Sequence, residues 1–241
     1  SPHLTQTGGS TTVVDCRGEQ IDSLLAREWL TTNRIGAFAS GTLAGCNTRR
    51  YHGLLVAATS PPVGRIMMLS TVMERLETGG ESYDLATNEF DTVFSPTGYQ
   101  HLTEFRNEAA ITFVYRIGEC ELTKDILLAD AENAVTLRYT LRGASGRLVL
   151  SPFAAIRDFH ELRLASRANQ LTFLTSESGA IVKDSENPTY TLDLGAHGGR
   201  FVPAPDWWYS FHYRNEAARG QDAQEDLYSP GRFEYELQDQ G

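Results

Sequence analysis

Residues 111–122 read ITFVYRIGECEL, and this stretch decides the fold class. Large apolar side chains occupy every second position from Ile111 to Ile117, which is the period of a β-strand with one face in a core. Gly118-Glu119 then provides a turn, and Cys120 and Leu122 resume the alternation. The stretch therefore predicts a β-hairpin.

The same period of two continues toward the C-terminus. Residues 135–142 alternate apolar with polar side chains, the turn-like segment 143–146 follows, and residues 148–150 begin a second run. We expect this segment to form another hairpin. Shorter alternations, each flanked by Gly, Asn, Asp or Pro, occur at 171–173, 190–194 and 233–237.

Helical patterns are confined to two short stretches, 21–29 and 216–227, which do not alternate with strands as a parallel sheet requires. Neither an internal repeat nor a linker-like run divides the chain. We expect one all-β domain over residues 13–241, a large antiparallel two-sheet β-sandwich with one or two short helices. The polar residues 1–12 are expected to be a disordered leader or a remnant of cloning.

The composition of the 241 residues is that of a globular protein, with 41% apolar and 22% charged side chains. The 31 acidic and 21 basic residues give a net charge of −10, which opposes binding to nucleic acid or to anionic membranes. No apolar run approaches the roughly 18–20 residues of a membrane span, and the first residues lack the features of a signal peptide. We expect a soluble cytoplasmic protein.

Cysteine and histidine usage argues against a disulfide framework and a metal site. Cys16, Cys46 and Cys120 are odd in number and widely spaced, which is typical of buried, idle thiols in a reducing compartment. The six histidines show no HxH or HExxH spacing. We therefore expect neither a metal ion nor a cofactor.

A polar, glycine-rich segment, residues 28–58, differs from the rest of the chain. Its glycines do not match a phosphate-binding spacing. If 47–52 is extended, Arg49 and Arg50 point to opposite sides, so that at least one of them faces inward or toward a partner. A guanidinium there can brace loops through carbonyls and carboxylates, or it can bind sugar hydroxyls, and both interpretations remain open.

Two acidic motifs and one aromatic motif complete the candidates. Asp158 and His160 share one strand face, as a carboxylate orienting an imidazole would, but no nucleophile-elbow Ser or Cys accompanies them. The adjacent pair at 225–226 points to opposite sides of a strand and is not by itself a facing acid pair. Trp207 and Trp208 follow stiffening prolines and can form a sugar-stacking platform or pack in the core.

Together these motifs resemble the N-terminal domain of bacterial and archaeal type glycogen debranching enzymes, from about residue 28 to the end. One departure is Arg34-Ile35-Gly36-Ala37, where the family has Gly-Leu-Gly-Gly. The resemblance is carried by Glu28-Trp29-Leu30, Thr32-Asn33, Gly36, Ala39-Ser40-Gly41-Thr42, Gly45, the run Asn47 to Leu55, Pro61 to Arg65, Arg157 to His160 and Glu225 to Gly231.

The resemblance implies a β-sandwich that precedes an α/α barrel, and the barrel carries the catalytic carboxylates of an amylo-α-1,6-glucosidase. That barrel is absent from this chain, so no catalytic residue carries over and the chain alone is expected to be inactive. Its expected partners are the barrel domain and a glycogen-like branched α-glucan. The candidates for the shared surface or cleft are Asn47, Arg49, Arg50, Tyr51, His52, Asp158, His160, Glu225 and Asp226.

Two alternatives belong to other functional classes. The chain can be a free-standing α-glucan-binding module that uses Trp207 or Trp208, or a self-contained hydrolase that uses Asp158 or Glu225.

Overall fold

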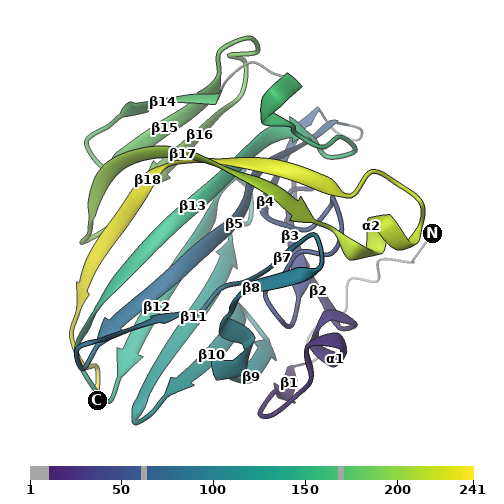
Figure 1. Ribbon diagram of the computed structural model, residues 1–241. Helices are drawn as coiled ribbons and strands as arrows, with labels where there is room; N and C mark the ends of the chain where they lie inside the picture. The colour runs from purple at the N-terminus through teal and green to yellow at the C-terminus, as the bar shows by residue number, and fades with distance from the viewer. Residues whose placement is uncertain (1–10, 61–63, 168–170) are drawn as a thin grey trace.

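The computed structural model describes residues 11–60, 64–167 and 171–241, which form mostly strands (Figure 1). Every strand pairing among them is antiparallel. Two large sheets and a small third one carry the fold, so the predicted all-β sandwich is confirmed. The predicted leader, 1–12, lies outside the described residues up to residue 10, and Thr12 already begins a strand.

The first sheet has five strands. The predicted hairpin at 111–122 lies at its centre, with Ile111 opposite Ile126 and Ile117 opposite Cys120. In spatial order the strands are β1 (Thr12–Asp15), β9 (Leu102–Asn107), β10 (Ile111–Ile117), β11 (Cys120–Leu128) and β12 (Val135–Arg142).

The second sheet has ten strands, nine in one path and β6 (Glu81–Asp84) paired to the outer part of β5. In spatial order the path is β2 (Glu28–Thr32), β3 (Phe38–Thr42), β4 (Gly53–Ser60), β5 (Gly64–Thr78), β13 (Gly146–Asp158), β18 (Gln224–Leu237), β17 (Arg200–His212), β7 (Thr87–Phe90) and β8 (Val93–Thr97).

A three-stranded sheet was not predicted as a separate unit. It consists of β14 (Leu171–Thr175), β15 (Gly179–Asp184) and β16 (Thr191–Gly195), and its buried Leu171, Val182 and Leu192 extend the main core. The short helices are α1 (Ile21–Leu25), α2 (Arg214–Ala218) and two 3-10 turns, Gly98–His101 and Ala165–Arg167.

Three sequence predictions about elements are wrong in detail. Both predicted helices end early because strand pairing takes over, with Trp29 in β2 and Gln224 beginning β18. The segment 135–150 is not a hairpin, because β12 pairs with β11 in one sheet while β13 pairs with β5 and β18 in the other. Alternating strands on either side of a turn fit a hairpin and a crossover between sheets equally well.

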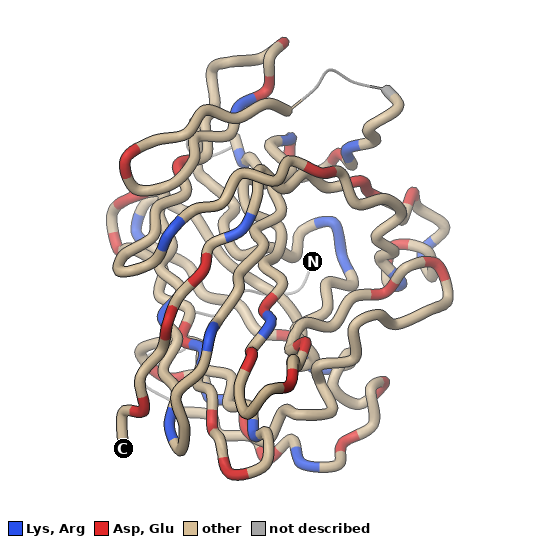
Figure 2. Tube along the Cα trace, turned by 60° about the vertical axis from the view of Figure 1, so that its left-hand side comes forward, with Lys and Arg blue, Asp and Glu red and all other residues tan. Residues whose placement is uncertain are grey.

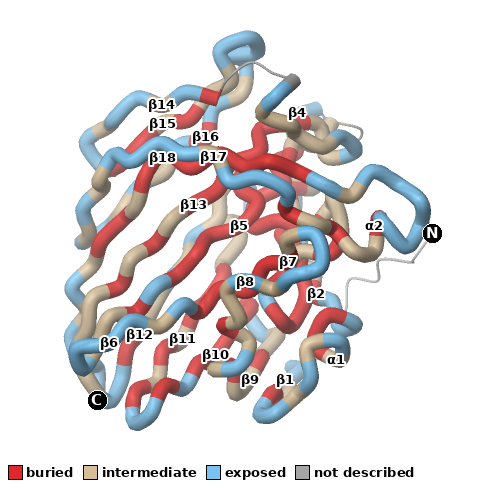
Figure 3. Tube along the Cα trace, viewed as in Figure 1, coloured by how far each residue is buried: buried red, intermediate tan, exposed pale blue. Residues whose placement is uncertain are grey.

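The main core lies between the two large sheets. Phe105, Phe113 and Leu122 of the five-stranded sheet belong to one buried cluster with Leu69 and Leu148 of the ten-stranded sheet. Burial of this kind contributes roughly 25 cal/mol for each Å² of apolar surface removed from water. In Figure 3 the long strands β5 and β13 are buried along most of their length, while β17 is largely exposed.

The ten-stranded sheet also has a second apolar face, because it curls into a half-barrel. β6 pairs with β5 and β7 pairs with β17, so that the short link between β6 and β7 bridges two distant strands of the sheet. Inside the curl lies a separate buried cluster that includes Met73, Phe153 and Phe211. Bulges in β13 and β17, where Ile156 and Ser210 adopt positive φ angles of 45° and 64°, help the sheet to bend.

Candidate functional site

The arginine loop, defined as residues 47–52, is a turn between β3 and β4 rather than the extended segment considered above. The His52 backbone N–H donates to the Arg49 carbonyl at 3.1 Å. The backbone N–H groups of Thr48 and Arg49 in turn donate to His52 Nδ1, at 3.0 and 3.3 Å. The side chains therefore do not alternate from side to side, and the imidazole holds the turn together from inside.

Glu28 fixes the other side of that imidazole. Because Nδ1 of His52 accepts two hydrogen bonds, Nε2 carries the proton and donates to Glu28 Oε1 at 2.8 Å. Arg49 Nε donates to the same oxygen at 2.6 Å. The hydrogen bond from His52, together with that from Arg49, lowers the pKa of Glu28 to about 2. The sequence motif at Glu28 and the one at 47–52 therefore form a single network.

Arg50 binds elements that are distant in sequence. Its Nη1 donates to the His160 carbonyl at 2.5 Å and its Nη2 donates to the Asp222 carbonyl at 3.2 Å. Its Nε lies 3.6 Å from Glu216 of α2, and only 14% of the side chain is exposed. Of the two interpretations left open for the arginines, bracing describes the contacts of Arg50 within the described residues.

A buried ion pair lies beneath the arginine loop. Nε and Nη2 of Arg157 donate to the two carboxylate oxygens of Glu225, and the two side chains are 3% and 0% exposed. Glu225 also accepts from the Tyr213 hydroxyl at 2.7 Å and from the Arg163 backbone N–H at 2.8 Å. Arg157 Nη2 reaches the Arg50 carbonyl at 3.0 Å. Burial of the charges is thus compensated by a complete set of partners.

Asp226, next in sequence, holds the bulge of β17. Its two oxygens accept the backbone N–H groups of Ser210 at 2.9 Å and Ala165 at 3.0 Å. Arg163 acts similarly on β13, donating to the carbonyls of Ala155 at 2.5 Å and Ile156 at 2.6 Å. The motifs at 157–163 and 225–226 therefore stabilise the two bulges at which the half-barrel bends.

The accessible part of this region is an aromatic edge, defined as the exposed His160 and the half-buried Tyr51 and Phe159. The ring centroids lie 5.4 Å apart for Tyr51 and Phe159 and 4.0 Å apart for Phe159 and His160. Asp158 Oδ1 lies 3.0 Å from His160 Nδ1, so the predicted couple exists, at the surface. The prediction that they share a strand face is wrong, because β13 ends at Asp158 and His160 lies in the turn that follows. Asn47 lies deeper and donates to the Ser70 carbonyl at 3.2 Å.

The two adjacent tryptophans have opposite environments. Trp207 packs against the core between the sheets, with its ring 5.3 Å from that of Tyr228. Trp208 faces the half-barrel, 39% exposed, and its ring packs on Phe153 at 5.3 Å and Phe90 at 6.3 Å. The two rings therefore point to opposite faces of the sheet, and Trp208 is the more exposed of the two.

Trp208 lines the barrel groove, a hollow of about 890 Å³ at the mouth of the half-barrel. This volume lies within the roughly 300–1,000 Å³ of small-molecule sites, which often occupy the mouths of barrels. The lining residues are Met73, Glu74, Arg75, Glu77, Ser82, Tyr83, Asp84, Ser95, Pro96, Thr97, His101, Arg147, Val149, Ser151, Phe153, Ala204, Asp206, Trp208, Ser229, Gly231 and Arg232.

Each arginine that lines the groove is paired with a carboxylate. Arg75 Nε donates to Asp84 at 3.0 Å, and Arg232 Nε donates to Glu234 at 2.9 Å. Hydrogen bonds from arginines, with that of Arg200 foremost, lower the pKa of Glu234 to about 2. Figure 2 shows acidic and basic positions interspersed over the molecule rather than gathered in one field. The groove therefore suits an uncharged polar ligand better than a polyanion.

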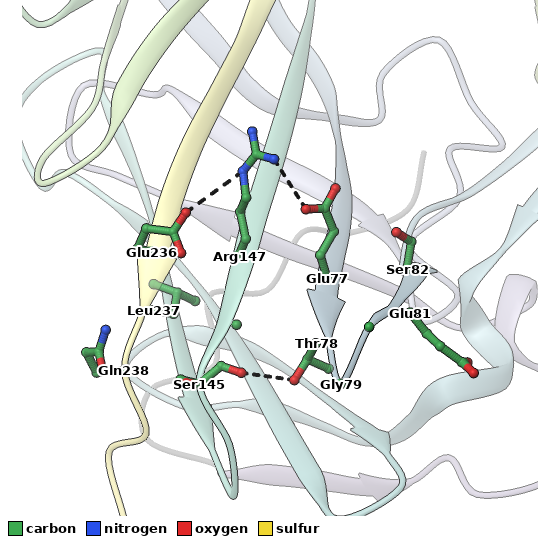
Figure 4. A pocket seen from close by; sticks show the side chains of 12 residues that line it. Glu77, Thr78, Gly79, Glu81, Ser82, Ser145, Arg147, Glu236, Leu237 and Gln238 are labelled. Carbon is green, nitrogen blue, oxygen red and sulfur yellow. Dashed lines mark hydrogen bonds and ion pairs between the residues drawn. The ribbon is translucent and has the colours of Figure 1, made fainter.

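A smaller hollow of about 510 Å³ adjoins the groove and shares Glu77, Ser82 and Arg147 with it. Arg147 lies between two carboxylates there, with Nη1 3.4 Å from Glu77 and Nε 4.0 Å from Glu236 (Figure 4). Its third partner is Glu234. Three carboxylates therefore pair with this guanidinium, and Glu81 adds a further acidic side chain to the lining.

Sequence reasoning missed the groove, apart from Trp208. Its floor and walls come from alternate positions of several strands, such as Arg147, Val149 and Ser151 of β13. In sequence these positions form the more polar side of an amphipathic strand, which indicates an ordinary solvent-facing side. The one sequence feature that could have indicated the groove was Trp208, a large aromatic residue on the solvent-facing side of its strand.

The three cysteines are free and buried, as predicted. Burial raises the pKa of Cys16 to about 11 and that of Cys46 to about 12, so neither thiol is reactive near neutral pH. No helix in the described ranges is long and apolar enough to cross a membrane.

Two large antiparallel sheets, one of them curled at bulges that Asp226 and Arg163 hold, give the described residues the architecture of a β-sandwich. Comparison with curated proteins finds no match. The family described as "Glycogen debranching enzyme N terminal" matches residues 27–241. The chain belongs to this family.

Proposed function

We propose that the chain is the non-catalytic domain of an enzyme that hydrolyses α-1,6-glucosidic branches in a glycogen-like glucan. In this proposal it packs on an α/α-barrel catalytic domain and helps to complete that domain's active-site cleft. Membership of the debranching-enzyme N-terminal family supports the parentage. Glu225 is fully buried and bonded on both oxygens, so the hydrolase alternative lacks an accessible acid at that position.

The observation that carries the packing role is the aromatic edge. Tyr51 and His160 project from loops that Arg50 and Arg157 tie to α2 and β18, so the edge is rigid before any partner arrives. Rigid aromatic side chains at a surface are the typical anchors of protein interfaces, because little conformational entropy is lost when they bind.

Association with a separately produced α/α-barrel catalytic domain tests this proposal. Sedimentation velocity should show a complex for the wild-type chain, and a Tyr51→Ala/His160→Ala double variant should bind about tenfold more weakly, or about 1.4 kcal/mol. Tyr209→Ala is the matched control, since Tyr209 is 60% exposed on β17. Equal binding by all three proteins, or no complex at all, would contradict the proposal.

A further inference from the structure

We propose that the barrel groove binds a segment of α-glucan chain, with Trp208 as the ring on which one glucosyl unit stacks. The groove itself is assembled by the fold. The identity of the sugar as an α-glucan rests on the proposed function.

Trp208 has the environment of a binding aromatic rather than of a core residue. Phe153, 1% exposed, and Phe90 support its ring from behind, while 39% of its surface remains accessible at the groove. The apolar CH face of a pyranose ring can pack on such a surface without displacing hydrogen-bonded groups. Since the ring is already held in place, its ordering costs little when a ligand binds.

The rim of the groove offers hydrogen-bonding groups for hydroxyls. Ser82 and Ser95 are exposed, and their hydroxyls have no side-chain partner among the described residues. Asp206 accepts one bond, from the Trp207 N–H, and its second oxygen is unbonded in that same set. Arg75 is held by Asp84 through Nε, and 54% of its side chain is exposed. The rim thus offers both donors and acceptors, and the hydroxyls of a sugar chain can bond to either.

The paired charges argue for a neutral ligand. An anion that approached Arg75 or Arg232 would also approach the carboxylates of Asp84 and Glu234 that are paired with them. A sugar can use the remaining N–H groups and lone pairs while these pairs stay intact.

Glycine at position 231 shapes the wall of the groove. A Cβ there would collide with the Val202 carbonyl, so glycine lets β17 approach β18 at this point.

Isothermal titration with maltoheptaose tests the proposal on the full chain. Wild-type protein should bind, Trp208→Ala should lose about tenfold in affinity, and Arg75→Ala about threefold. Tyr209→Ala, which removes an exposed aromatic neighbour outside the groove lining, should bind within about twofold of wild type. Thermal melting of each variant separates loss of binding from loss of folding, and Arg75→Ala, at an exposed position, keeps the test valid if Trp208→Ala unfolds.

Each outcome decides the proposal. Absence of maltoheptaose binding at millimolar sugar, or equal affinity of wild type and the Trp208→Ala and Arg75→Ala variants, would overturn it. Equal affinity for cellohexaose, a β-linked chain, would overturn the α-glucan assignment. If the sugar does not bind but the catalytic domain still associates, this inference fails and the proposed function stands. If the sugar binds and no association is found, the proposed function fails instead.

Discussion

Around the arginine loop nearly every polar side chain is bonded to another part of the chain, whereas the barrel groove presents an aromatic ring and several hydroxyls to solvent. Arg157 and Glu225 are 3% and 0% exposed, and Trp208 is 39% exposed. The first region is dense in sequence motifs and the second has almost none. The comparison teaches that a dense polar motif in a β-sandwich can serve to shape the sheet, while the open surface lies elsewhere.

The two regions are mechanically linked. Asp226 and Arg163 hold the bulges at Ser210 and Ile156, and these bulges bend the strands that bring Trp208 over Phe153. Strained backbone of this kind persists only where surrounding bonds fix it. The motif region can therefore matter for ligand binding without any contact with the ligand.

The largest loss of stability is expected when the buried Arg157–Glu225 pair is broken. Arg157→Met leaves Glu225 charged and buried, so we expect a loss of about 3–5 kcal/mol in the free energy of unfolding, measured by urea denaturation. Arg157→Met/Glu225→Leu removes both charges and should recover a large part of that loss. A single variant within about 1 kcal/mol of wild type would show that the motif is not structural.

The adjacent tryptophans allow the same comparison at two neighbouring positions of β17. Trp207→Ala removes a ring from the core between the sheets and should cost about 2–3 kcal/mol, whereas Trp208→Ala should cost about 1 kcal/mol because its ring is partly exposed. Urea denaturation of both variants provides the measurement. The reverse order of stability would place Trp208 in the core and weaken the case for a ligand.

Substitution of Glu28 should have an intermediate effect on the free energy of unfolding, and this effect should depend on pH. Its pKa in the folded chain, about 2, lies below its ordinary value of 4.5, so its bonds to His52 and Arg49 stabilise the fold fully above about pH 4.5. That stabilisation fades as the pH falls through about 2. Because 37% of the side chain is exposed, we expect Glu28→Gln to cost only about 1 kcal/mol at neutral pH.

Stability measured from about pH 6 down to pH 2 should then fall less steeply for Glu28→Gln than for wild type. Parallel curves for the two proteins would mean that the Glu28 network contributes nothing.

Breaking the exposed Asp158–His160 couple should change the free energy of unfolding least. Asp158 and His160 are 46% and 63% exposed, so Asp158→Asn should change the free energy of unfolding by less than about 0.5 kcal/mol. A loss near that of Arg157→Met in the same urea titration would mean that the exposed couple is structural as well.

Sequence reasoning predicted the sheets more accurately than the sites. The period of two at 111–122 identified a hairpin that the structure contains, because local alternation determines which face of a strand is buried. The segment 135–150 was predicted wrongly, since alternation carries no information about which sheet a strand joins. The partners of Arg157 and Glu225, 68 positions apart, depend on the packing of β13 beside β18, which no local pattern reveals.

The central claim is that the groove binds ligand, while the bonded polar groups beneath the arginine loop shape the sheet. It is tested most directly by titrating maltoheptaose into the ¹⁵N-labelled chain. We predict chemical-shift changes at the Trp208 indole N–H and at amides of the groove strands β5, β6 and β17, with the amides of residues 47–52 unchanged. Shifts confined to the arginine loop, or none anywhere, would contradict the account.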